Sequence, residues 1–145
     1  MIEPKKIILV DDNKIDLFVN QKIIELFDPD IQIKAFTKAT SALCYLKILE
    51  FNKDFKSVFI PDAIVLDINM PEMDGFEFLC ELEQLEIVKN NSIAVYMLSS
   101  SSYPEDMVKA KKHNLCSGYF NKPLTKAMLV NMLSYENSGF SLGNY

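Results

Sequence analysis

Residues 63–75 read AIVLDINMPEMDG, and this stretch indicates both a fold class and a candidate site. The apolar residues Ala63 to Leu66 lead directly into a carboxylate, Asp67. An unbroken apolar run of this length is typical of a strand buried on both faces, as in a parallel sheet covered by helices. The Pro, Asp and Gly residues that follow predict a turn. Asp67 therefore lies at the carboxyl end of a buried strand, where open α/β sheets place their sites.

The rest of the chain repeats a strand and a helix, giving five such units in all. Besides Ala63 to Leu66, strands are predicted at residues 7–10, 31–36, 93–98 and 118–120. The intervening segments have helical apolar spacing. Alternation of this kind implies an α/β fold, with a parallel sheet and helices on both of its faces.

On two of the predicted helices, a row of apolar residues is predicted to face the core. In the first helix the apolar residues recur every four positions, and in the third they follow mixed three- and four-residue spacing. The first stripe is Ile15, Val19, Ile23 and Phe27, and the second is Phe78, Leu79, Leu82 and Leu85.

Size, charge and cysteine usage limit the classes of protein to consider. The 145 residues suit one domain, and a net charge of −5 argues against a nucleic-acid-binding surface. No apolar run approaches the roughly 20 residues that span a bilayer, and the N-terminus lacks a signal-peptide layout. The widely spaced Cys44, Cys80 and Cys116 are expected to be reduced, buried thiols. We therefore expect a cytoplasmic protein without membrane insertion. His113, the one histidine, is interpreted as structural or solvated.

Polar side chains follow four of the predicted strands. Asp11 and Asp12 end the first, Asp67 the third, Ser99 the fourth and Lys122 the fifth. Because the carboxyl ends of parallel strands share one edge of the sheet, three carboxylates, a hydroxyl and an ammonium converge there. Crowded carboxylates resist ionising together, and a divalent cation such as Mg²⁺ relieves their repulsion. A lysine and a hydroxyl beside the metal favour a phosphoryl group, with Asp67 as the nucleophile.

These residues resemble the receiver domain of two-component response regulators over about residues 5–133. The matching features are the Asp11–Asp12 pair, DINMPEMDG around Asp67, MLSS at residues 97–100 and YFNKP at residues 119–123. The resemblance implies a five-stranded parallel sheet in a flavodoxin-like, doubly wound (βα)5 fold. It also implies a chemotaxis-type, stand-alone phosphorylation switch.

The resemblance assigns the metal and phosphoacceptor roles residue by residue. Asp67 would accept a phosphoryl group from a histidine kinase or a histidine phosphotransfer protein. Asp12 would ligate Mg²⁺ or Mn²⁺ directly and Asp11 through water, with Asp67 and the backbone carbonyl of Asn69 completing the protein ligands.

It also assigns the switch residues and an output surface. Ser99 would contact a phosphoryl oxygen, Lys122 would pair with the phosphoryl group, and Tyr119 would turn inward as Ser99 moves. The Lys122–Pro123 bond is a candidate for the cis form. The downstream protein would bind the helix after Pro104, the fifth strand and the helix after Thr125. Residues 1–133 would form the domain and residues 134–145 a polar, flexible tail.

Two other functions remain open at this point, and a third is less favoured. A hydrolytic phosphatase also places an Asp after a buried strand, but it normally has a second carboxylate two residues on, where this chain has Asn69. A binding module that keeps the pocket without needing phosphorylation is the second alternative. A flavin-binding domain is disfavoured because no phosphate-binding loop follows the first strand. The receiver resemblance predicts no turnover beyond self-phosphorylation and slow dephosphorylation.

Overall fold

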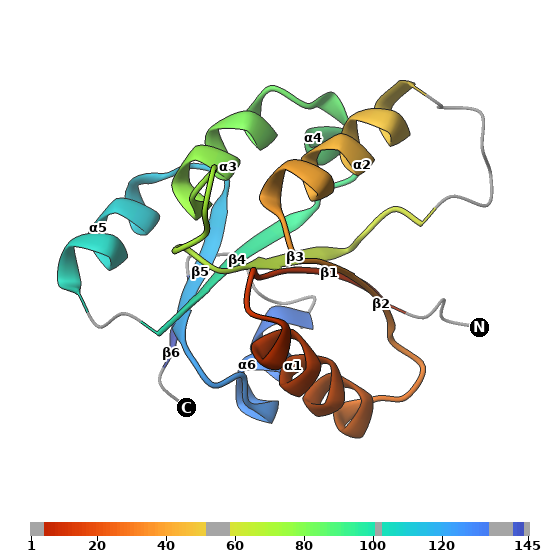
Figure 1. Ribbon diagram of the computed structural model, residues 1–145, viewed down its shortest axis with the longest axis vertical. Coiled ribbons are helices and arrows are strands. Elements are labelled where there is room, and N and C mark those ends of the chain that lie inside the picture. Colours follow the sequence, from red (N-terminus) through yellow and green to blue (C-terminus); the bar gives the residue numbers. More distant parts are fainter. Residues whose placement is uncertain (1–4, 52–58, 101–102, 134–140, 144–145) are drawn as a thin grey trace.

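The computed structural model describes residues 5–51, 59–100, 103–133 and 141–143, and its centre is a parallel sheet (Figure 1). The strand order is β2-β1-β3-β4-β5-β6. The strands are β1 (Lys6–Val10), β2 (Gln32–Phe36), β3 (Ala63–Leu66), β4 (Ala94–Ser99), β5 (Cys116–Asn121) and β6 (Ser141–Gly143). The predicted five-stranded, flavodoxin-like parallel sheet is confirmed, and β6 adds a short sixth strand at its edge.

Helices cover both faces of the sheet (Figure 1). The helices are α1 (Lys14–Phe27), α2 (Ala39–Phe51), α3 (Gly75–Glu83), α4 (Glu86–Asn90), α5 (Pro104–Lys112) and α6 (Lys126–Leu133). Figure 1 shows α1 and α6 on one face, with α2, α3, α4 and α5 on the other. The side chains of β1, β3 and β4 alternate between two apolar clusters, one under each layer of helices. Burial on both faces explains why the central strands read as unbroken apolar runs.

Local sequence signals set the ends of several helices. Asp74 and Glu77 form a capping box at the start of α3, and Pro104 is the first residue of α5. The side-chain oxygen of Thr125 accepts the Met128 N–H at 3.2 Å, which caps the start of α6. The segment between α3 and β4 contains a further short helix, α4.

The predicted inward stripe of α1 is wrong at Ile15 and Val19 but is borne out in part at Ile23 and Phe27, which are half-buried and pack against the core. Ile15 is 74% exposed and Val19 41%, whereas Leu17 and Ile24 are buried against the sheet. Four-residue spacing overshoots a helical turn by about 40° at each step, so the stripe begins on the solvent side at Ile15 and winds toward the core side at Phe27. Leu17 and Ile24 are seven residues apart and return to nearly the same face. The stripe of α3 is confirmed, since all four of its residues are buried.

The expectation of three buried thiols is also wrong. Cys44 on α2 and Cys80 on α3 are exposed, and only Cys116 is buried. Each exposed cysteine lies on the side of its helix away from the sheet, which apolar spacing alone does not reveal for a small thiol. The flexible tail stays a prediction, because residues 134–140 and 144–145 lie outside the described residues. Ser141–Gly143 pairs in parallel with Gly118–Phe120.

Candidate functional site

Backbone hydrogen bonds bring the predicted strand ends together. The Asp67 N–H donates to the Val10 carbonyl at 2.9 Å, just beyond the paired part of β1 and β3. The Lys122 N–H donates to the Ser99 carbonyl at 2.8 Å, just beyond the β4–β5 pairing. The strand ends therefore form one continuous edge, as the sequence predicts for parallel strands.

Asp11, Asp12 and Asp67 form a carboxylate cluster at this edge. One ligand oxygen from each residue lies within 4.8 Å of the other two. Asp11 and Asp67 are buried and Asp12 is exposed, so the cluster opens to solvent on the Asp12 side. A sparse set of hard oxygen ligands with access for water suits Mg²⁺ or Mn²⁺ better than a softer metal. The three side chains thus fit the predicted metal site.

Lys122 is the cation of the cluster. Its Nζ donates to Asp11 Oδ2 and to Asp16 Oδ2, each at 2.8 Å, and lies 3.6 Å from Asp67 Oδ2. Burial by itself lowers the pKa of Lys122, but the hydrogen bonds to Asp11 and Asp16 and the charge of Asp67 outweigh it and raise the pKa. The ammonium therefore stays protonated and faces three carboxylates.

Asp67 sits where ionisation is costly. Burial is the largest cause that raises its pKa, and the charge of Asp11 adds to it. Lys122 and the backbone N–H groups of Ile68 and Asn69 act in the opposite direction, and the resulting pKa is about 6. At neutral pH the carboxylate is mostly ionised, which a nucleophile requires, while it remains close to its titration point.

Ser99 and Tyr119 connect this edge to β5. Both side chains are buried, and a side-chain hydrogen bond joins them. Burial raises the pKa of Tyr119, the hydrogen bond with Ser99 lowers it in part, and the charge of Asp106 raises it again. The Tyr119 ring is thus already in the inward position in this structure.

Two further predictions concern backbone groups. Asn69 is exposed and its N–H is hydrogen-bonded to the Asp67 carboxylate, so the metal-ligand role of its carbonyl stays a prediction. The Lys122–Pro123 peptide bond, a candidate for the cis form from the sequence, is cis.

Three residues support the site that sequence reasoning did not assign to it. Asp16 shares Lys122 with Asp11, and the Asn13 N–H donates to Asp11 Oδ1 at 2.9 Å while its side chain caps α1. A Cβ at Gly75 would lie 2.8 Å from the Asp67 carbonyl oxygen, so only glycine lets α3 begin this close to β3. Asp16 had a usable signal, because a carboxylate in the first turn after an acidic strand end points back toward that end.

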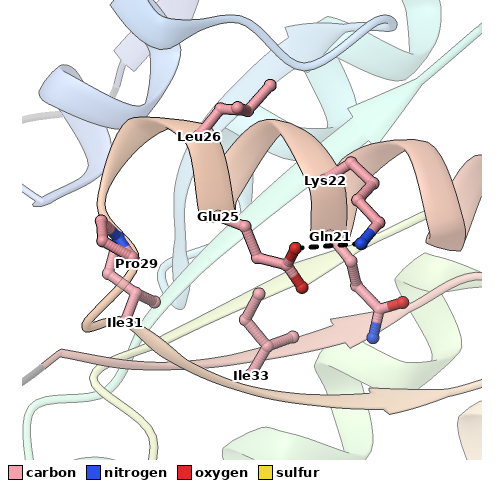
Figure 2. Close-up of a pocket in the computed structure, with 7 residues that line it drawn as sticks. All are labelled: Gln21, Lys22, Glu25, Leu26, Pro29, Ile31 and Ile33. Atoms are coloured by element: carbon pink, nitrogen blue, oxygen red, sulfur yellow. Dashed lines mark hydrogen bonds and ion pairs between the residues drawn. The ribbon is translucent and has the colours of Figure 1, made fainter.

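A hollow elsewhere on the surface lacks comparable chemistry. It lies between the second half of α1 and the start of β2, and its lining residues are Gln21, Lys22, Glu25, Leu26, Pro29, Ile31 and Ile33 (Figure 2). Its two charged groups, Lys22 and Glu25, pair with each other at 3.2 Å and are about half exposed. An exposed pair of this kind contributes little and leaves no convergent polar groups. The carboxylate cluster is therefore the better candidate.

No helix among the described residues is long and apolar enough to cross a membrane.

Comparisons with known proteins give a consistent result. The family model described as "Response regulator receiver domain" matches residues 7–134. Response regulator Rcp1 from Synechocystis is 29% identical over 105 residues, which is 72% of this chain and 68% of Rcp1. Two-component response regulator ARR10 from Arabidopsis thaliana is 31% identical over 88% of this chain, but the chain spans only 20% of ARR10. A two-component response regulator structure from Cytophaga hutchinsonii has a TM-score of 0.78 and 30% identity, covering 90% of this chain and 95% of that one.

Proposed function

The chain belongs to the response regulator receiver domain family, and we propose that it is a switch whose phosphoacceptor is Asp67. Membership of the family implies phosphorylation-dependent two-component signalling. The observation that carries the choice of Asp67 is its position between the Lys122 ammonium, 3.6 Å away, and the carboxylates of Asp11 and Asp12. This position provides a nucleophile, a cation and oxygen ligands within one small region.

The proposed transfer needs little from the protein besides placement and charge. An oxygen of Asp67 attacks the phosphorus of a phosphohistidine, the phosphorus–nitrogen bond breaks, and the electron pair stays on the donor's imidazole nitrogen. Lys122 neutralises charge on the transferred oxygens. Asp11, Asp12 and Asp67 would hold Mg²⁺ or Mn²⁺, which supplies further positive charge when bound. The protein's own chemistry is then self-phosphorylation and slow loss of the phosphoryl group.

We place the phosphodonor over the start of α1. Ile15 is 74% exposed and Phe18 60%, and both lie within two turns of Asp12. Exposed apolar side chains gathered beside a polar site mark a surface that a partner covers. A histidine kinase or a histidine phosphotransfer protein bound here would bring its histidine to the open side of the cluster. We also propose a cytoplasmic location, as predicted from the sequence.

The output surface is proposed to be α5, β5 and α6, together with β6, which pairs with the outer edge of β5. Tyr119 lies on β5 and is joined to Ser99, so a change at the phosphorylated edge reaches this surface directly. Exposed apolar side chains occur on both flanking helices, with Tyr103 and Val108 at α5 and Val130 on α6. A downstream protein would bind there, without a role for nucleic acid.

Phosphorylation with a small donor tests the proposal. Acetyl phosphate with Mg²⁺ is expected to add one phosphoryl group to the intact protein by mass spectrometry, and a chelator is expected to prevent it. Asp67→Asn is expected to abolish the addition. Asp62→Asn, at the other end of the same strand, is the matched control and is expected to react like the wild type. Equal labelling of Asp67→Asn and wild type would overturn the proposal.

Two further measurements separate the alternatives. A phosphatase would release phosphate continuously from phosphomonoesters, which the missing carboxylate at Asn69 argues against. A phosphorylation-independent binding module would hold its partner equally well with Asp67→Ala.

A further inference from the structure

Cys80, His113 and Glu83 form a thiol–imidazole–carboxylate series outside the phosphorylation site. Cys80 Sγ lies 3.9 Å from His113 Nε2, and His113 Nδ1 lies 3.3 Å from Glu83 Oε1. The cysteine and the glutamate come from α3, whereas the histidine caps the C-terminal end of α5. The imidazole thus has one nitrogen facing the sulfur and the other facing the carboxylate.

The surroundings of the imidazole suit a base that accepts a proton. The His113 side chain is 16% exposed, and its Nδ1 has no aligned hydrogen bond, which leaves Glu83 as its nearest anion. The last-turn carbonyls of α5 also favour a positive charge at its C-terminal cap, although Lys109, Lys111 and Lys112 in the same turn oppose it. Glu83 therefore stabilises the imidazolium that forms when the thiol gives up its proton.

The other two cysteines lack this arrangement. Cys44 is exposed on α2, and no hydrogen bond or ion pair to it occurs within the described part of the chain. Cys116 is buried, and burial raises its pKa to about 11. The molecule therefore carries an exposed thiol with a base, an exposed thiol without one, and a buried thiol.

We propose that Cys80 is a site of oxidative modification by small hydroperoxides, with His113 as its general base and Glu83 as the residue that positions the base. The sulfur attacks the distal peroxide oxygen as its proton passes to Nε2, and the oxygen–oxygen bond breaks. The leaving alkoxide or hydroxide then takes that proton from the imidazolium. The thiol becomes a sulfenic acid and loses two electrons, and the hydroperoxide becomes an alcohol or water. Because the sulfur is exposed, a small oxidant needs no enclosed pocket.

Competition between thiols of the same molecule tests this proposal. The full chain is treated with hydrogen peroxide and a sulfenic-acid trap, and peptide mass spectrometry gives the rate at Cys80 relative to Cys44. We expect a ratio of about ten, below the roughly hundredfold effect of a general base in an enzyme, since the sulfur is open to water. His113→Gln is expected to bring the Cys80 rate down to that of Cys44, and Glu83→Gln to give an intermediate rate.

Cys116 reports whether the variants are folded. Its labelling stays negligible while the core is intact, and if His113→Gln exposes it, the exposed Glu83→Gln substitution carries the test instead. A Cys80 to Cys44 ratio near one in the wild type, or an unchanged ratio in a folded variant, would overturn the proposal. Normal phosphorylation of these variants by acetyl phosphate is expected, because the series is separate from Asp67.

Discussion

The Lys122 ammonium donates a 2.8 Å hydrogen bond to Asp11, one of the two buried carboxylates at the carboxyl edge of the sheet. The same ammonium is 3.6 Å from Asp67 Oδ2, so it attracts that carboxylate at a longer distance than it does Asp11. A phosphoryl group on Asp67 would bring new anionic oxygens to Lys122. The pair of Lys122 and Asp11 is therefore the contact that we expect phosphorylation to rearrange.

The raised pKa of Asp67 predicts that its ionised form destabilises the fold. The folded-state pKa is about 6, above the unfolded value of about 4, so the protein loses stability as pH rises between these values. Asp67→Asn carries no charge and escapes this loss. In chelator, we expect the variant to be more stable than wild type by about 2 to 3 kcal/mol at pH 8, with the difference nearly gone at pH 4. Urea unfolding across this range measures it, and a difference independent of pH would contradict the account.

Loss of Lys122 is predicted to be strongly destabilising. Lys122→Met leaves Asp11, Asp16 and Asp67 without their cation, which we expect to cost about 3 kcal/mol at pH 8. The cost should shrink at pH 5, because Asp67 then takes up a proton. Lys126→Met, an exposed lysine at the start of α6, is the matched control and should change stability little. Chemical denaturation at both pH values gives the comparison.

Gly75 is predicted to tolerate no side chain. In Gly75→Ala, the new Cβ would lie 2.8 Å from the Asp67 carbonyl oxygen, 2.8 Å from Leu66 Cδ1 and 2.9 Å from Met97 Cε. The leucine and methionine side chains can move, whereas the backbone oxygen moves only with β3, so we expect a loss of about 1 to 3 kcal/mol. The rate of phosphorylation by acetyl phosphate should fall as well. The double variant Gly75→Ala/Met97→Ala should not recover the rate, and full recovery would show that the contact with the Met97 side chain alone matters.

Strand β6 is predicted to protect the edge of the sheet. Ser141–Gly143 pairs with Gly118–Phe120, so its removal leaves the outer edge of β5 without a partner. Truncation after residue 140 is expected to speed hydrogen exchange of amides in Cys116–Asn121. Amides of β1 and β3 serve as the internal control and should keep their protection. Unchanged exchange in β5 would mean that the pairing is too brief to protect it.

The sequence predicts the centre of the molecule better than its periphery. Ala63–Leu66 is found with its predicted bounds, because strands buried on both faces must be apolar throughout. Asp11, Asp67 and Lys122 come together because parallel strands end on the same edge, which requires no knowledge of side-chain packing. Sequence order and residue type were therefore enough to assemble the main part of the candidate site.

What the sequence missed depends on geometry that residue type does not specify. Ile15 and Val19 are exposed because the buried face of α1 is the one that carries Leu17 and Ile24, and apolar spacing does not specify which of two apolar rows faces the sheet. The approach of Cys80 to His113 joins residues 33 positions apart on two helices, which no local spacing reveals. Strand β6 has three residues and no apolar run, so it carries no periodic signal.

The central claim is that a phosphoryl group on Asp67 acts through Ser99 on Tyr119. The most direct test is the NMR spectrum with Mg²⁺ and beryllofluoride, a mimic of the phosphoryl group, in wild type and in Asp67→Asn. We expect the signals near Ser99 and Tyr119 to shift in the wild type and to stay unchanged in the variant. An unchanged wild-type spectrum, or the same shifts in Asp67→Asn, would contradict the account.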